Sequence, residues 1–210
     1  GKYLGRNQVY YEGYHEMSYL LPKYFKPNPA ILSDYGLSPG ERFFILRLVS
    51  WGATHDRGQK GIDNLSAIVE HLGKYGAVFI STESKLTSNL ESSTADISPV
   101  DMPTMLAYAR MYLGEGATMA SESATLGTPA IYVNTQNLGY IDALVEAGLV
   151  YHIKPRQNAL AKILDTIDEI MAKPPEHFNK IRERFLSDKI DVVEFIEKEL
   201  IALAKRRYSS

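Results

Sequence analysis

A glycine-containing turn followed by small residues is the segment of this sequence best suited to chemistry. Gly114-Glu115-Gly116 ends a short apolar run, and the small residues from Ala117 onward follow at once. Small side chains let a phosphate approach the backbone, and the first N–H groups of a helix have no partner within it. We therefore predict that Gly116, Ala117 and Thr118 bind a diphosphate, with Thr118 capping the helix or adding a hydroxyl.

Glu122 is the second chemical feature of this segment. It lies four residues beyond Thr118, which in a helix is roughly 6 Å along the axis at 1.5 Å per residue. That offset suits a carboxylate that accepts two hydroxyl hydrogens of a ribose attached to the phosphate. A second interpretation stays open, in which alanine and serine are present only for the close packing of a tight turn.

His55 is the candidate catalytic residue. It follows the apolar run 43–49, and open parallel sheets bind ligands at the carboxyl ends of their strands. Facing a cleft, it would donate to a diphosphate oxygen or stabilise a leaving nucleotide, with Asp56 or a backbone carbonyl setting its tautomer. Arg57 and Lys60 would add positive charge there. The alternative is a solvated polar loop.

The elements that must position these residues alternate along the chain. Apolar runs predict strands at 43–49, 77–81, 111–114, 129–134 and 149–153. Helical spacing or stop signals predict helices at 61–73, 103–109, 118–126, 140–147, 158–171, 177–187 and 191–205. This alternation predicts an α/β fold, with a Rossmann-like, open, mostly parallel sheet covered by helices on both faces.

Composition excludes several classes of function. The chain has 210 residues, a formal charge of -2 and no cysteine, which excludes disulfides and thiolate chemistry and makes nucleic acid a poor partner. There is no apolar run of membrane-spanning length and no signal peptide, so we expect a cytoplasmic protein. Glu12, His15 and Glu16 lack a ligand frame, which favours a surface cluster over a metal site.

The first 40 residues differ from the rest. Seven of the 14 tyrosines lie in the first 35 residues, among several prolines and without sustained periodicity. We predict a connector or wrap over residues 1–40 and a Rossmann-like domain with C-terminal helices over 41–210. The tyrosines would pack on this same domain or on a missing N-terminal domain. The abrupt start at Gly1-Lys2-Tyr3 indicates a fragment.

Residues 114–134 resemble the nucleotide-sugar motif of the GT-B superfamily, which includes two-domain glycosyltransferases and UDP-N-acetylglucosamine 2-epimerases. Leu126-Gly127-Thr128-Pro129 matches the family's helix stop, and Glu122 falls on the glutamate that binds ribose. The resemblance implies that residues 99–103, including Met102 and Pro103, contact the base. It also implies a UDP-sugar as the substrate, with no separate cofactor.

The chain as a whole, especially Gly13-Tyr14-His15-Glu16 and Trp51-Gly52-Ala53-Thr54-His55-Asp56, resembles the uncharacterised prokaryotic family called domain of unknown function 354. The paired glycines of the epimerase turn are absent, so transfer and epimerisation both stay open. We expect half of a GT-B-like enzyme, inactive alone. The alternative is a non-catalytic sugar-phosphate-binding or partner-docking module, for which a homo-oligomer is also expected.

Overall fold

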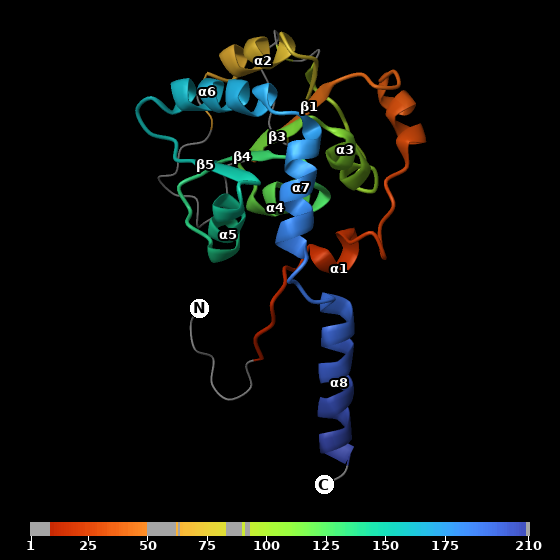
Figure 1. Ribbon diagram of the computed structural model, residues 1–210. Coiled ribbons are helices and arrows are strands. Elements are labelled where there is room, and N and C mark those ends of the chain that lie inside the picture. The colour runs from red at the N-terminus through yellow and green to blue at the C-terminus, as the bar shows by residue number, and fades with distance from the viewer. Residues whose placement is uncertain (1–8, 50–61, 63, 83–89, 91–92, 209–210) are drawn as a thin grey trace.

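The chain is built on a parallel sheet (Figure 1). A computed structural model describes residues 9–49, 62, 64–82, 90 and 93–208. Within them lies a five-stranded sheet in the order β2-β1-β3-β4-β5, every neighbouring pair being parallel. The strands are β1 (Phe43–Leu48), β2 (Ala77–Thr82), β3 (Met111–Gly114), β4 (Ala130–Val133) and β5 (Val150–Ile153). The predicted fold class is confirmed.

Helices cover both faces of this sheet. One face carries α3 (Met102–Tyr108), α4 (Ala117–Leu126) and α5 (Gly139–Ala147), and the other carries α2 (Leu65–Gly73) and α6 (Ala159–Ala172). Along β1, Phe43 and Ile45 enter the first core whereas Phe44 and Leu46 enter the second. Both sets are fully buried because successive side chains of a strand point to opposite faces.

Two short helices interrupt the first 40 residues, where no regular structure was predicted. They are α1 (Met17–Leu20) and the 3-10 helix η1 (Pro29–Tyr35). Asn28 caps η1 by accepting from the N–H of Ala30, and Gly36 ends it with a φ of 73°. At four and seven residues, these elements are too short to show a helical period, so only their contacts with the domain stabilise them.

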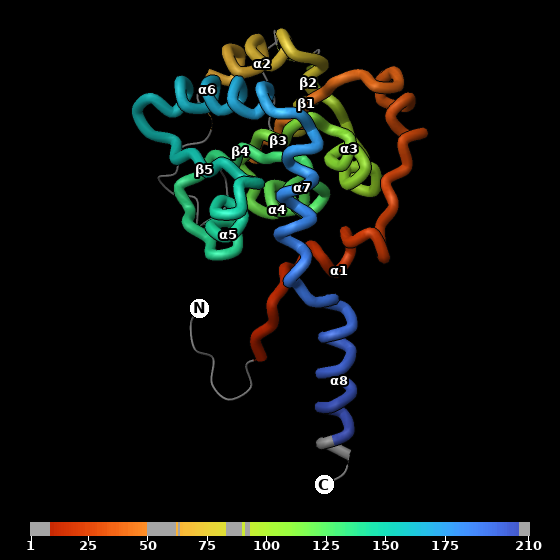
Figure 2. The backbone as a smooth tube through the Cα atoms, viewed as in Figure 1, coloured from red at the N-terminus to blue at the C-terminus, as the bar shows by residue number. Residues whose placement is uncertain are grey.

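The segment before η1 packs against the C-terminal helices. After α7 (Pro175–Leu186), α8 (Val192–Tyr208) extends away from the sheet, and both the N-terminal segment and α8 leave on the same side (Figure 2). The Ile190 N–H donates to the Glu12 carbonyl at 2.9 Å, and the rings of Tyr11 and Phe195 lie 5.3 Å apart. Further along α8, Leu200 and Leu203 are more than half exposed.

Candidate functional site

The candidate site lies where the strand order reverses. From β1 the chain goes first to β2 on one side and then to β3 on the other. The carboxyl ends of β1 and β3 therefore lie side by side at the point where doubly wound sheets bind ligands. α4 begins three residues after β3 ends, so the predicted diphosphate turn lies at this point.

The start of α4 leaves backbone donors available. Gly116 is the N-cap, in an extended conformation and without a side-chain capping bond, and the first bond within the helix runs from the Ala120 N–H to its carbonyl at 3.2 Å. The N–H groups of Ala117, Thr118 and Met119 thus have no partner inside the helix. Thr118 is exposed and Ala117 half-buried. These groups and the helix dipole together favour an anion.

Glu122 is half-buried and contacts the N-terminal segment. The hydroxyl of Tyr19, in α1, donates to its Oε1 at 2.8 Å. Burial raises the pKa of the Glu122 carboxyl, the bond from Tyr19 opposes that rise, and the negative charge of Glu16 adds to it. One carboxylate oxygen therefore has a protein donor, and a carboxylate has the capacity to accept further hydrogens from a ligand.

Two tyrosines lie near the start of α4. Burial raises the pKa of the Tyr140 hydroxyl, at the start of α5, and the nearby Thr118 side chain opposes that rise. Tyr132, on β4, is fully buried, and its hydroxyl has no hydrogen-bond partner. Burial and the nearby Tyr140 raise the pKa of Tyr132 to about 12. An unpaired buried hydroxyl is costly, so polar groups are retained here at some expense of stability.

Glu115 connects the segment after β1 to the candidate site by hydrogen bonds. Only 4% of this residue is exposed, and its carboxylate accepts the Val49 N–H at 2.9 Å and the Ile62 N–H at 2.6 Å. Its carbonyl accepts from Asn134 Nδ2 at 2.9 Å. Glu115 thus holds both ends of the segment that carries the predicted His55 loop. His55 itself, with Asp56, Arg57 and Lys60, lies outside the described residues.

Met102 and Pro103 form the first turn of α3, next to α4 in the same layer. Both are half-buried. The Tyr35 hydroxyl accepts from the Ser98 N–H at 3.2 Å and donates to Asp101 Oδ2 at 2.9 Å, so η1 anchors the loop that precedes them. Since helices that follow parallel strands begin at the carboxyl edge, these two residues lie at the same edge as Gly116.

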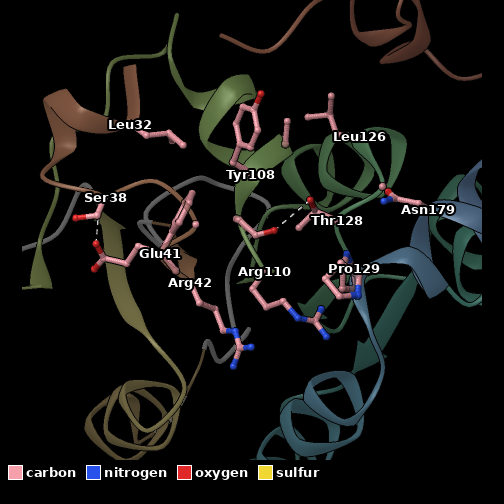
Figure 3. A pocket seen from close by; sticks show the side chains of 16 residues that line it. Leu32, Ser38, Glu41, Arg42, Tyr108, Arg110, Leu126, Thr128, Pro129 and Asn179 are labelled. Atoms are coloured by element: carbon pink, nitrogen blue, oxygen red, sulfur yellow. Dashed lines mark hydrogen bonds between the residues drawn. The ribbon is translucent and has the colours of Figure 1, made fainter. Parts of the chain in front are cut away.

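A cavity of about 380 Å³ lies at the opposite edge, between the start of β1 and the ends of α3 and α4 (Figure 3). Three of its polar side chains, those of Glu41, Thr128 and Arg110, have partners in the protein. The Ser38 N–H donates to Glu41 at 2.9 Å, Thr128 donates to the Leu106 carbonyl at 2.7 Å, and Arg110 donates to the Ile170 carbonyl at 2.7 Å. This cavity is separate from the candidate site.

The sequence indicated only part of this arrangement. Glu16 was expected at the surface, but it is 6% exposed and lies among Tyr19, Tyr140 and Glu122. Among the described residues, no group of three or more histidine, aspartate or glutamate side chains could hold a metal ion. The contact between Tyr19 and Glu122 had no sequence signal, because 103 residues separate them.

Comparison with known families identifies the chain. The model of the family described as Protein of unknown function (DUF354) matches residues 2–196. The chain belongs to this family. No curated protein matches it. In the part of the chain that the structure covers, we find no helix with the length and apolar character needed to cross a membrane.

Solved structures similar to this family member include a glycosyltransferase, a UDP-GlcNAc 2-epimerase and a wall teichoic acid polymerase. WaaG, a glycosyltransferase involved in lipopolysaccharide biosynthesis, has a TM-score of 0.58 at 14% identity, over 88% of this chain and 53% of that one. The UDP-GlcNAc 2-epimerase from Neisseria meningitidis, bound to UDP-GlcNAc, has a TM-score of 0.52 at 15% identity, over 82% and 47%.

The wall teichoic acid polymerase TagF has a TM-score of 0.51 at 16% identity, over 94% of this chain and 51% of that one. At such low identity the likeness shows the fold alone, which is GT-B-like. The chain spans about half the length of these structures.

Proposed function

We propose that this chain binds a nucleotide sugar, with UDP as its nucleotide, at the carboxyl edge of the sheet. The observation that carries the proposal is the uncapped start of α4 where the strand order reverses between β1 and β3, with the Glu122 carboxylate one turn further along. The N–H groups of residues 116–118 would bind the diphosphate and Glu122 the ribose. Met102 and Pro103 would contact the base.

Turnover would involve residues beyond this binding half. We propose that His55 acts on the diphosphate or on the leaving UDP, from the loop whose ends Glu115 holds. A second domain would supply the acceptor site. The similar solved structures are about twice as long as this chain, and that length is enough to include such a domain. The exposed side chains of Tyr10 and Leu200, on the side where the N-terminal segment and α8 leave, support such a contact.

Replacing Glu122 with alanine is expected to weaken UDP binding about tenfold, because hydrogen bonds to a charged group contribute roughly 1.5–3 kcal/mol. Isothermal titration of the full chain with UDP measures this. Glu183→Ala, an exposed glutamate of α7, is the matched control and should bind like the unaltered chain. Equal affinity of the unaltered chain and the Glu122 variant would refute the proposed ribose contact.

The dependence of binding on the nucleobase distinguishes this function from the alternative of a sugar-phosphate-binding module. A ligand at 100 times its dissociation constant adds ~2.7 kcal/mol of stability, which a thermal-shift panel detects. The proposed function requires UDP and UDP-sugars to stabilise the chain more than ADP, GDP or glucose 1-phosphate. Equal shifts with glucose 1-phosphate and UDP would favour the sugar-phosphate module instead.

Replacing Tyr19 with phenylalanine is expected to shift the pH dependence of binding. The Tyr19 bond favours the charged Glu122 and lowers its raised pKa, so its loss raises that pKa further. Ribose hydroxyls donate to a carboxylate, so affinity falls as the pH drops through the Glu122 pKa, and in the variant this fall begins at higher pH. UDP-glucose titrations at successive pH values between about 7.5 and 4.5 measure the shift.

Tyr24→Phe is the control for this experiment, since its hydroxyl contacts Asp191 rather than Glu122. UDP-glucose is chosen because its diphosphate does not titrate across this range. Identical profiles for the Tyr19 variant and the unaltered chain would show that Tyr19 does not act through Glu122.

A further inference from the structure

A second cavity lies beside the candidate site, between the N-terminal segment and α5. Its volume is about 320 Å³, at the small end of the range for small-molecule sites. It is lined by Gly13, Tyr14, His15, Glu16 and Tyr140. Four of these residues form one continuous turn, the motif singled out in the sequence, and the fifth comes from the start of α5.

The wall of this cavity is pre-organised. The Met17 N–H donates to the Tyr14 carbonyl at 3.1 Å, and the Ser18 N–H donates to the His15 carbonyl at 2.9 Å. A Cβ on Gly13 would lie 2.7 Å from Val192 Cγ2, so the turn packs closely on the start of α8. The ring of Tyr14 contacts Phe185, with the centroids 5.4 Å apart.

The chemistry of the lining favours a neutral, hydroxyl-bearing ligand group. Tyr14 and Tyr140 provide aromatic faces and hydroxyls, and the 6% exposed Glu16 provides a carboxylate acceptor. The Glu16 carboxylate in this lining disfavours a phosphate or a carboxylate inside the cavity, whereas the hydroxyls of a sugar ring can donate to it.

The cavity adjoins both parts of the candidate nucleotide site. Tyr140 lies at the start of α5, which packs against α4, and Thr118, at the start of α4 where the diphosphate would lie, acts on the Tyr140 hydroxyl. Glu16 is within electrostatic reach of Glu122 and of Tyr19. A group attached to the far phosphate of a bound diphosphate can therefore reach this cavity without leaving the site.

We propose that the cavity formed by residues 13–16 and Tyr140 binds the sugar ring of the nucleotide sugar, with Glu16 as the residue that accepts its hydroxyl hydrogens. This assignment rests on the proposed function and extends it to the glycosyl half of the ligand. Sites built to bond a hydroxyl discriminate strongly against ligands that lack it. Glu16 thus distinguishes a nucleotide sugar from the bare nucleotide.

Titrations of the full chain with UDP and with UDP-glucose at pH 7.5 test the proposal. Glu16→Gln keeps the shape of the side chain but removes the charged acceptor, and is expected to weaken UDP-glucose binding about tenfold while the UDP affinity stays within twofold. Tyr14→Phe is a second variant, expected to act in the same direction. Glu183→Gln, an exposed glutamate of α7, is the matched control and should change neither affinity.

The outcomes separate this assignment from the function it rests on. Selective loss of UDP-glucose affinity in Glu16→Gln or in Tyr14→Phe supports it. Equal changes for the two ligands, or no change in either variant, would overturn it while UDP binding to the unaltered chain still stands. Absence of UDP binding to the unaltered chain would overturn the proposed function and this assignment together.

Discussion

Replacing Glu115 with alanine is expected to lower the free energy of unfolding by about 3 kcal/mol. The buried carboxylate accepts the backbone N–H groups of Val49 and Ile62, and a hydrogen bond to a charged group contributes roughly 1.5–3 kcal/mol. The variant leaves two donors without this acceptor and releases both ends of the segment between β1 and α2. Urea unfolding followed by circular dichroism measures the change.

Glu70→Ala is the control for this experiment, because Glu70 is exposed on α2. Surface substitutions of this kind usually change stability by less than ~0.5 kcal/mol. The loss of unfolding free energy in Glu115→Gln should lie between those of Glu115→Ala and Glu70→Ala, because an amide has one acceptor oxygen and a carboxylate has two. A loss below about 1 kcal/mol in Glu115→Ala would show that water replaces the carboxylate at these donors.

Replacing Gly114 with alanine is expected to destabilise the chain by about 3 kcal/mol or more. A Cβ there would lie 2.3 Å from the Tyr112 hydroxyl oxygen and 2.7 Å from the Arg47 carbonyl oxygen. Tyr112 is fully buried and donates to the Gly116 carbonyl at 3.3 Å, so its ring cannot move without disturbing the turn into α4. Overpacking of a core typically costs 1–3 kcal/mol, and displaced backbone adds to that cost.

Gly139→Ala provides the matched glycine control. This residue is exposed, begins α5, and has no atom within 4 Å of the position its Cβ would take. Alanine favours the helix over glycine by up to ~1 kcal/mol, so the control should be neutral or stabilising. Thermal unfolding compares the two variants directly, and equal melting temperatures would contradict the close contact at Gly114.

The strands and most helices could be predicted because their signal is local. Runs such as Phe43-Phe44-Ile45-Leu46 are apolar throughout because the strand is buried on both faces. The end of the helix at Leu126 could also be predicted, because a glycine at 127 and a proline at 129 are typical helix stop signals. In the structure Gly127 adopts a φ of 93°. By contrast, α1 and η1 have no local pattern, because their stability comes from contacts with α4 and α3.

The candidate site also combines features that the local sequence displays with features that it does not. The proposed phosphate-binding role of residues 116–118 follows from small side chains at the start of a helix, which a single stretch of sequence displays. The role of Glu115 does not, because its two donors are 66 and 53 residues away. A glutamate between two glycines looks the same whether it faces solvent or holds a loop.

The amino-acid sequence alone therefore determined the class of fold, and it predicted the edge of the sheet at which a ligand would bind and the helix that would receive it. These follow from periodicity and from turn residues, which act over a few positions. Only the tertiary structure decided that Tyr19 donates to Glu122, that Glu16 is buried, and that residues 13–16 face Tyr140. Such contacts depend on how a connecting segment packs across the finished domain, and no local pattern encodes that path.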